Sequence, residues 1–478
     1  MGAPDLAAAI VRHDLTLART NACPEDYDGW DGPVPGAQRF SRSAAPMLDP
    51  FRRPDVRALH LSTRLHGTDG VSLEARKVAD ALGGFGFAPF VCAGEIDRRD
   101  PDAYLVSEMH FEDAVARELG ARAFSGTTPD PTLEEAIDAR AAELAASIST
   151  VIDAVQPDLL VVQNAWAIPM QLPLARALAD VARHTQLPCL SHEHDYHWER
   201  ERFATTRIPE FLDTYFPFDA PNVRHLCING PARDELARRR GIRASLLPNV
   251  FDFHTDAPGI DAFNHDFRDA IGMTRGQRLF LQPTRVVPRK GVELAIDLLA
   301  ELGDPRDVLV VTHRAGDEGV AYLRTLERHA LERDVDFRYV ADQIDETRGE
   351  RAGAKVYALW DAYPHADFVT YPSLYEGFGN ALLETIHFRK PALVNRYSVY
   401  VADIAPKGFR FVEIEGAVSA RAVREVAELL EDPARQEAMT EHNLDLARRH
   451  YALDALREPL ATALRDLGFR VAHRRDAP

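Results

Sequence analysis

Two carboxylates and two glycines lie close together in the segment YPSLYEGFGNALLE, residues 371–384. Glu376 directly precedes the glycine loop of Gly377 and Gly379, and Glu384 follows in an expected helix. A glycine loop that opens a helix lets the backbone approach a ligand closely and presents unpaired N–H groups to an anion. Carboxylates accept hydrogen bonds from sugar and ribose hydroxyls. The segment therefore predicts a site for a phosphorylated sugar, although a solvated loop glutamate and a surface glutamate on a helix are an equally simple interpretation.

A basic pair, Arg285 and Lys290, lies in the segment TRVVPRKG between an expected strand and an expected helix. Cations at the carboxyl edge of an open α/β sheet lie where such sheets bind ligands. Arginine can bind a diphosphate through two parallel hydrogen bonds, and lysine adds a point charge. Two loop cations alone would indicate only a solvated surface, but with the glycine loop and its carboxylates they favour a diphosphate site.

The histidine-rich segment HEHDYHWERERF raises a second chemistry. It offers four candidate metal ligands: His192, His194, Asp195 and His197. The HxHxDH pattern of binuclear hydrolases has its aspartate one position later, so we predict no metal here. As a residue at a strand end, His194 is the better candidate for a histidine in a cleft. His192 is the alternative, because alternate strand residues share a face. For either residue, a satisfied histidine in the core or at the rim is the competing interpretation.

Cations and an aromatic residue, Trp198, Arg200 and Arg202, follow this segment's histidines. They could line a site for a sugar or a small anionic acceptor. We interpret Glu199 and Glu201 as part of a solvated charge run.

Alternating strands and helices must position these residues. Apolar runs predict strands at 56–62, 159–162, 187–191, 279–282, 308–311, 337–340 and 368–371, and helices at 71–82 and 292–302. The clearest helix carries six apolar residues on one face: Ile137, Ala141, Leu144, Ile148, Val151 and Val155. From about residue 418 the pattern is helical to the end.

This order predicts an α/β protein with two doubly wound Rossmann-like domains that face each other across a cleft. The pattern restarts after Leu247-Pro248-Asn249. We expect an N-terminal domain over 1–248 on the acceptor side and a C-terminal domain over 249–445 on the donor side. A C-terminal helix in 446–478 is expected to cross back to the first domain.

At these motifs the sequence resembles the retaining family-4 glycosyltransferases of GT-B fold, the glycosyl transferases group 1. Arg285 and Lys290 look like the Arg-x4-Lys pair of that family, and Glu376 with Glu384 looks like its Glu-x7-Glu motif. The resemblance covers most of residues 55–450. It implies that the basic pair holds the donor diphosphate, that Glu376 meets hydroxyls of the transferred sugar and that Glu384 meets the ribose.

The loop RLHGTDG, residues 64–70, resembles the family's N-terminal glycine loop, although an ordinary turn would also use two glycines. The resemblance implies that His194 hydrogen-bonds the sugar near the reacting carbon. The catalytic residues expected are His194, Glu376, Arg285 and Lys290. The donor-binding residues expected are Gly70, Arg285, Lys290, Glu376, Gly377, Phe378, Gly379, Asn380 and Glu384. The acceptor-binding residues expected are Arg64, His66, His192, Trp198, Arg200 and Arg202.

Three segments depart from the family pattern. VTHRAGDEG lacks a Gly-x-Gly after the strand at 308–311, YVADQ lacks an expected glycine, and ALVNRYSVYVADIAPKGF replaces a loop with twin glycines. These departures leave the identity of the nucleotide base and the details of sugar binding open.

The implied function is transfer of a hexose from a nucleotide sugar such as UDP-glucose or GDP-mannose, with retention of configuration and without a metal or other cofactor. The expected acceptor is a hydroxyl of a small soluble molecule such as a sugar or a hydroxy acid. Three alternatives stay open: a catalytically silent nucleotide-sugar-binding protein, a sugar-nucleotide epimerase and a phosphorylase on the same architecture. A dehydrogenase is disfavoured, because LGGFGF at 82–87 lacks the order strand, GxGxxG, helix.

The composition limits the classes of partner that the protein is expected to bind. The formal net charge of -18 disfavours nucleic acid, and no apolar run reaches the ~20 residues of a membrane span. The N-terminus lacks the pattern of a signal peptide, so we expect a cytoplasmic protein. The protein could form a homo-oligomer. The scattered cysteines Cys23, Cys92, Cys189 and Cys227 are expected to be reduced, buried thiols.

Overall fold

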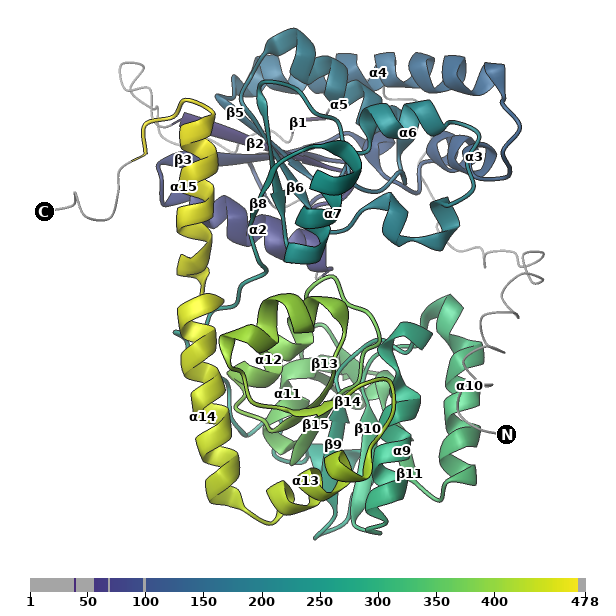
Figure 1. Cartoon of the computed structure of the whole chain (residues 1–478), viewed down its shortest axis with the longest axis vertical. Coiled ribbons are helices and arrows are strands. Elements are labelled where there is room, and N and C mark those ends of the chain that lie inside the picture. The colour runs from purple at the N-terminus through teal and green to yellow at the C-terminus, as the bar shows by residue number, and fades with distance from the viewer. Residues whose placement is uncertain (1–37, 40–55, 68, 98–99, 472–478) are drawn as a thin grey trace, which may run out of the picture. The chain divides into compact units, whose positions relative to one another are not determined.

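The computed structural model describes residues 38–39, 56–67, 69–97 and 100–471, with the backbone alone at 38–39 and 316–319. These residues belong to one compact unit, 37–478, and a second unit, 1–36, lies outside the described residues together with Cys23. Two largely parallel sheets with helices on their faces make up the unit (Figure 1). The predicted α/β class with two doubly wound sheets and a helical C-terminus is confirmed.

The first sheet has eight strands in the order β1-β4-β3-β2-β5-β6-β7-β8. Only β1 is antiparallel to its neighbour among these pairs. The strands are β1 (Gln38–Arg39), β2 (Val56–Ser62), β3 (Phe87–Ala93), β4 (Ala103–Leu105), β5 (Leu159–Gln163), β6 (Cys189–Glu193), β7 (Val223–Cys227) and β8 (Ala244–Leu246). Strand β6 begins two residues later than predicted, after Pro188, which has no N–H to donate to a neighbouring strand.

Within the described residues, six α-helices accompany this sheet, and with it they form the N-terminal lobe. They are α2 (Gly70–Gly83), α3 (Ala114–Ala123), α4 (Pro131–Val155), α5 (Leu172–Thr185), α6 (Pro209–Tyr215) and α7 (Gly230–Arg240). All six apolar residues that predicted helix α4 are buried, which confirms its amphipathic pattern.

The second sheet has six parallel strands in the order β11-β10-β9-β15-β16-β17. They are β9 (Arg278–Gln282), β10 (Asp307–Val311), β11 (Asp336–Tyr339), β15 (Phe368–Tyr371), β16 (Ala392–Asn395) and β17 (Val412–Ile414). The helices of this C-terminal lobe include α8 (Phe267–Ala270), α9 (Val292–Leu302), α10 (Gly316–Glu332), α11 (Leu359–Ala362), α12 (Asn380–His387) and α13 (Ala420–Leu430).

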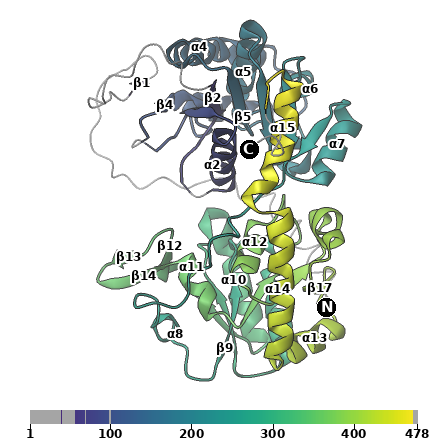
Figure 2. The same ribbon diagram turned by 90° about the vertical axis from the view of Figure 1, so that its left-hand side faces the viewer.

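Two features of this lobe were not predicted. A three-stranded sheet, β12-β14-β13, consists of β12 (Ile344–Asp345), β13 (Gly349–Arg351) and β14 (Ala354–Ala358), and it lies beside the main body of the lobe in Figure 2. A turn of π-helix spans Tyr400–Ile404. Strands of two to five residues and a single π turn carry too few residues for a hydrophobic period to reveal them.

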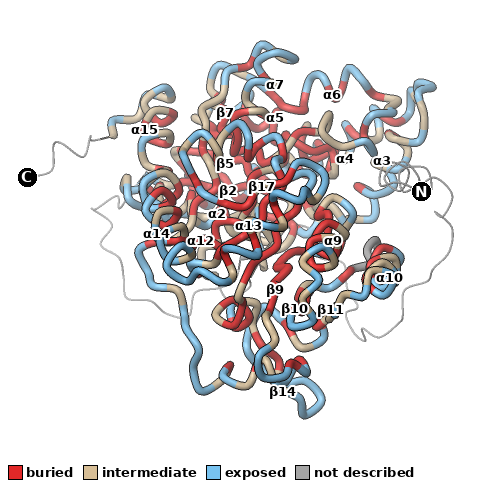
Figure 3. The backbone as a smooth tube through the Cα atoms, turned by 60° about the horizontal axis from the view of Figure 1, so that its bottom comes forward, coloured by how far each residue is buried: buried red, intermediate tan, exposed pale blue. Residues whose placement is uncertain are grey.

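The two last described helices contact both lobes. Helix α14 (Pro433–His450) packs against α12 and α13, and α15 (Arg457–Asp466) follows it. Leu460 and Leu464 of α15 share a buried cluster with Ala58 of β2 and Leu159 of β5. The central strands of both main sheets are buried along most of their length (Figure 3): β2, β5, β6 and β7 in the first sheet, and β9, β10, β15 and β16 in the second. The domain boundaries at 248/249 and 445/446 stay predictions.

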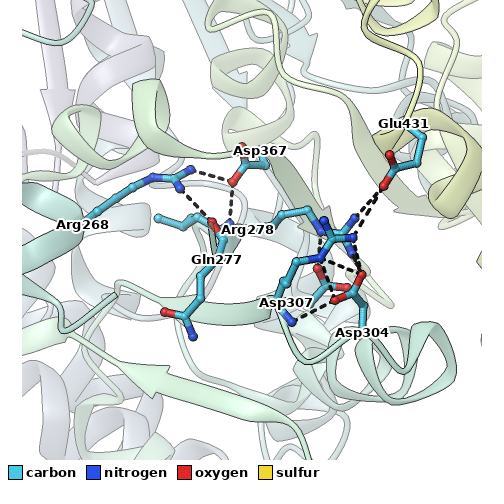
Figure 4. A network of polar contacts seen from close by, with 9 residues as sticks. Arg268, Gln277, Arg278, Asp304, Asp307, Asp367 and Glu431 are labelled. Carbon is cyan, nitrogen blue, oxygen red and sulfur yellow. Dashed lines mark hydrogen bonds and ion pairs between the residues drawn. The ribbon is translucent and has the colours of Figure 1, made fainter. Parts of the chain in front are cut away.

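Ion pairs hold the amino ends of the second sheet. Arg278 at the start of β9 contacts Asp307 Oδ1 at 2.5 Å and Asp304 Oδ2 at 2.9 Å (Figure 4). Asp367 accepts the backbone N–H of Leu279 at 2.6 Å and pairs with Arg268 at 2.6 Å. This edge lies opposite the carboxyl ends of the strands, so the network stabilises the sheet without occupying the ligand edge.

Candidate active site

The carboxyl ends of strands from both sheets border a cavity of about 930 Å³. Arg64 and His194 come from the loops that follow β2 and β6, and Arg285 and Glu376 from those that follow β9 and β15. Parallel α/β sheets bind ligands at this edge, since loops of several strands converge there. The cavity collects twelve of the residues that the sequence predicted: Arg64, Gly70, His194, Arg200, Arg202, Arg285, Lys290, Glu376, Gly377, Phe378, Gly379 and Asn380.

A short 3-10 turn, Pro288–Lys290, carries the cations of the second lobe. Gly291 ends it with a positive φ of 59°, and a Cβ there would lie 2.6 Å from the carbonyl oxygen of Pro372. The N–H of Leu374 donates to the carbonyl of Arg289 at 2.8 Å. The cation turn and the start of the glycine loop are therefore packed backbone to backbone, which requires glycine at position 291.

Lys290 and Glu376 form a buried ion pair, with 8% and 6% of each residue exposed. Arg289 Nη1 contacts the other carboxylate oxygen of Glu376 at 3.2 Å. Burial lowers the pKa of Lys290, and the neighbouring arginines add to this effect. Burial opposes ionisation of Glu376, but the charges of Lys290 and Arg289 outweigh it and hold its pKa below the usual value. Glu376 is thus ionised and neutralises cations that an anionic ligand could use.

Helix α12 points its N-terminus into the same cavity. Its N-cap is Gly379, with φ of 126°, so no N-cap side chain bonds to the first N–H groups of the helix. Phe378, Gly379 and Asn380 line the cavity. An unsatisfied helix N-terminus beside cations is a site for phosphate.

The N-terminal lobe and the interdomain crossing reach this helix. Asn249 Nδ2 donates to Asn380 Oδ1 at 2.7 Å. A Cβ on Gly70 would lie 3.8 Å from Asn380 Nδ2, so the N-terminal glycine loop also adjoins the helix. The sequence predicts that Gly70 binds the donor, and Gly70 lines the cavity.

His194 lines the cavity, whereas His192 does not. Asn164, at the end of β5 with φ of 57°, accepts the backbone N–H of His194 at 2.9 Å. Burial lowers the pKa of His194 to about 4, so its ring is neutral at pH 7. His192 lies beneath it with ring centroids 4.5 Å apart, and its Nδ1 is bonded to Gln163 Oε1 at 2.9 Å. The two histidines share a face, but only His194 has access to the cavity.

Three arginines line the N-terminal side of the cavity: Arg64, Arg200 and Arg202. Arg64 Nε lies 3.4 Å from Asp69, which also caps helix α2, and its guanidinium lies 5.3 Å from the ring centroid of Phe111. Arg200 Nε donates to Asp195 at 2.7 Å. This wall can bind an anion, because guanidinium groups match carboxylate and phosphate geometry.

Glu199 also lines the cavity, and its interpretation as a solvated charge is wrong. Tyr375 of the other lobe donates its hydroxyl to Glu199 at 2.8 Å. Burial raises the pKa of Glu199 to about 7. Glu201 is exposed, although it also lies at the cavity. The 3-10 turns after β6 direct Glu199 towards the second lobe, which the local charge pattern could not indicate.

Three other predicted residues do not line the described cavity. His66 is exposed. The ring of Trp198 stacks on Tyr196 at 4.5 Å. Glu384 contacts Trp360 at 3.4 Å and Tyr363 at 3.1 Å. Their roles in ligand binding stay predictions.

Arg289, Asn164 and Asn249 are among the residues of the site that sequence reasoning missed. Arg289 adjoins Lys290 in PRKG, so its charge was visible, but its contact with Glu376 was not. Asn164 directly follows the apolar strand LLVVQ, and an asparagine at a strand end is typical of a turn. No local signal relates Asn249 to Asn380, which lies 131 residues further on.

The described residues offer no metal cluster or membrane-spanning helix. Within them, no three His, Cys, Asp or Glu side chains are grouped as possible ligands of a metal ion. No helix in the described ranges is long and apolar enough to cross a bilayer. Cys92, Cys189 and Cys227 are free and buried, as predicted.

Comparisons with known proteins agree with this geometry. The family model of the glycosyl transferases group 1 matches residues 264–444. The chain is 29% identical to a mannosylglucosylglycerate synthase of Thermotoga maritima over 82% of this chain and 96% of the relative. Its fold is similar to that of a UDP-forming trehalose-phosphate synthase of Burkholderia xenovorans, with a TM-score of 0.62 at 15% identity, covering 87% of this chain and 100% of the other. HepE of Anabaena, crystallised with UDP-glucose, has a TM-score of 0.59 at 13% identity, covering 86% and 99%. The carboxyl-edge cavity with its cation turn and glycine loop, together with these matches, identifies a glycosyltransferase with the GT-B fold, whose residues 264–444 match the glycosyl transferases group 1.

Proposed function

We propose that the protein transfers a hexose from a nucleoside diphosphate sugar to a small anionic acceptor, with retention of configuration and without a metal ion. The most specific version of this proposal follows the name of the relatives, mannosylglucosylglycerate synthase. In that version the transferred hexose is mannose and the acceptor is glucosylglycerate. UDP-glucose and GDP-mannose are the donor types to be compared.

One observation carries the donor side of this proposal. Lys290, Arg289 and the N-terminus of α12 converge on the glycine loop at one wall of the cavity. Phosphate needs such cations and backbone donors. We assign the diphosphate to this wall and the transferred sugar to the space next to His194 and Glu376.

The proposed reaction proceeds on one face of the sugar. The bond between the anomeric carbon and the phosphate oxygen breaks, and the acceptor oxygen bonds to that carbon from the same side. The acceptor's proton passes to the departing phosphate oxygen. The cations and the helix N-terminus stabilise the charge that develops on the phosphate, so no protein nucleophile is needed. The neutral ring of His194 at pH 7 can donate a hydrogen bond to a sugar hydroxyl or accept one from it.

The acceptor side is supported by the arginines of the N-terminal lobe. Glucosylglycerate combines sugar hydroxyls with a carboxylate, and Arg64 lies on the cavity wall beside the aromatic ring of Phe111. A guanidinium held from one edge by Asp69 keeps a preferred orientation towards such a carboxylate. Arg64 is therefore our candidate for acceptor selection.

The test is product formation from each donor with glucosylglycerate, glycerate and glucose as acceptors, followed by NMR of the anomeric proton. We expect glucosylglycerate to be the best acceptor and the anomeric configuration to be kept, with activity unchanged by EDTA. An inverted product would refute the mechanism. Binding of nucleotide without any transfer would indicate a silent binding protein instead.

A further inference from the structure

Side chains outside the glycine loop, taken here as residues 373–380, donate hydrogen bonds to three of its backbone carbonyls. Tyr397 donates its hydroxyl to the carbonyl of Phe378 at 2.8 Å. Asn229 Nδ2 donates to the carbonyl of Gly377 at 2.7 Å. Asn395 Nδ2 donates to the carbonyl of Ser373 at 3.1 Å.

None of these three side chains lines the described cavity, whereas the loop residues 376–380 do. The C=O and the next N–H of a peptide unit point in opposite directions, because the unit is planar and trans. The hydrogen bonds from Asn229 and Tyr397 hold the carbonyls of Gly377 and Phe378 away from the cavity. The N–H groups of Phe378 and Gly379 therefore point towards the cavity. These are the groups that a phosphate would contact.

Tyr397 also packs closely against Gly379. A Cβ on Gly379 would lie 2.8 Å from the Tyr397 hydroxyl and 3.1 Å from that of Tyr371. Tyr397 is buried, and it belongs to ALVNRYSVYVADIAPKGF, the segment that departs from the family's twin-glycine loop. This departure therefore supplies a specific contact with the glycine loop.

Asn229 makes its contact from the other lobe. Its Oδ1 caps helix α7 by accepting the N–H of Ala232 at 2.7 Å, while its Nδ2 holds Gly377. The next residue, Gly230, donates its N–H to Asp403 at 2.6 Å, and Asp403 lies in the π turn that follows Tyr397. The N-terminus of α7 thus contacts both the glycine loop and the segment that holds it.

We propose that Tyr397 and Asn229 are positioning residues for the donor diphosphate, which act by orienting the N–H groups of the glycine loop. Because Asn229 belongs to the N-terminal lobe, the donor site is complete only when that lobe is seated on the loop. This inference rests on the proposed function, since it assumes that the loop binds a diphosphate.

The experiment measures the Kd of UDP and of GDP by calorimetry, with KM and kcat for the full reaction and Tm for each variant. Tyr397→Phe removes only the hydroxyl, and its matched control is Tyr357→Phe, another buried tyrosine, whose hydroxyl bonds to Asp266 at 2.8 Å. Asn229→Ser keeps a residue that caps helices well but loses the amide donor, whereas Asn229→Ala loses both.

We expect Tyr397→Phe and Asn229→Ser each to weaken nucleotide binding about three- to tenfold and to raise the donor KM likewise, as loss of one hydrogen bond would. The acceptor KM and the Kd of the Tyr357→Phe control should stay within twofold. Asn229→Ala should lower Tm more than Asn229→Ser yet weaken nucleotide binding equally, because the cap and the loop contact are separate.

An unchanged Kd in both Tyr397→Phe and Asn229→Ser, with the natural protein binding normally, would overturn the inference and leave the proposed function intact. A Kd that follows Tm across all variants, including the Tyr357→Phe control, would also overturn it, since stability alone would then explain the loss. If the natural protein binds neither nucleotide, the proposed function itself fails.

Discussion

Replacing Glu376 by glutamine should strengthen nucleotide binding while it abolishes transfer. The ligand-free site holds Glu376 against Lys290 and Arg289, the cations proposed to bind the diphosphate. Glutamine keeps the size and one acceptor oxygen but removes the negative charge. A bound phosphate then meets cations that no carboxylate neutralises.

The magnitude follows from Coulomb's law. A phosphate oxygen that contacts Lys290 would lie roughly 6 Å from the Glu376 carboxylate, if both contact the same ammonium group from different sides. Two unit charges at that distance repel by about 3 kcal/mol at an effective dielectric constant of ~20, and by about 0.7 kcal/mol in bulk water. UDP or GDP should therefore bind roughly three- to hundredfold more tightly to Glu376→Gln.

The same change should reduce stability and activity. Lys290 loses its buried counter-ion, so the free energy of unfolding without ligand should fall by about 1–3 kcal/mol. Turnover should fall at least a hundredfold if Glu376 orients hydroxyls of the sugar in the transition state. Calorimetry with the nucleoside diphosphate, which has no sugar, separates the two effects.

Weaker or unchanged binding of the nucleoside diphosphate to Glu376→Gln would refute the reasoning, because Glu376 would then not compete for the cations. Glu384→Gln is the matched control. It changes the other glutamate of the motif, which contacts Trp360 and Tyr363 rather than Lys290 or Arg289. Its nucleotide affinity should not rise.

Three further predictions concern pH and backbone geometry. Burial opposes the charged form of His225, but Glu193, 2.9 Å away, and Asp219 outweigh it and raise the His225 pKa to about 9. This pair should contribute about 3 kcal/mol below pH 6.5, a contribution lost as the pH rises through about 9, measured by unfolding against His225→Gln. Burial raises the pKa of Glu199 to about 7, so ionising it costs stability as the pH rises from about 4.5 to 7, and Glu199→Gln should be the more stable protein at pH 8 by up to about 3 kcal/mol. Gly291→Ala should lower the free energy of unfolding by about 1–3 kcal/mol, because φ is positive and the new Cβ would meet a backbone carbonyl.

Each of these has a control. A pH profile of His225→Gln parallel to that of the natural protein from pH 6 to 10 would contradict the first. For the second, Glu201→Gln changes an exposed neighbour and should leave stability unchanged at every pH. Gly276→Ala is the control for the third, because it also has a positive φ but no atom within 4 Å of the added Cβ. Equal losses at both glycines would indicate backbone strain alone.

The sequence by itself determined the clearest helices and strands and the donor motif. The six apolar residues from Ile137 to Val155 are all buried on helix α4, since a helical period depends only on neighbours along the chain. Arg285, Lys290, Glu376 and the glycine loop line one cavity, because the carboxyl ends of parallel strands in one sheet lie at the same edge.

Only the tertiary structure decided which side chains meet. Tyr375 contacts Glu199 across 176 residues of sequence, and Asn229 contacts Gly377 across 148. His194 and His192 share a face, yet only His194 reaches the cavity, because β6 ends at Glu193 and the chain turns there. Periodicity and spacing report the conformation of one segment, whereas burial, pKa and contact between lobes depend on what other segments place against it.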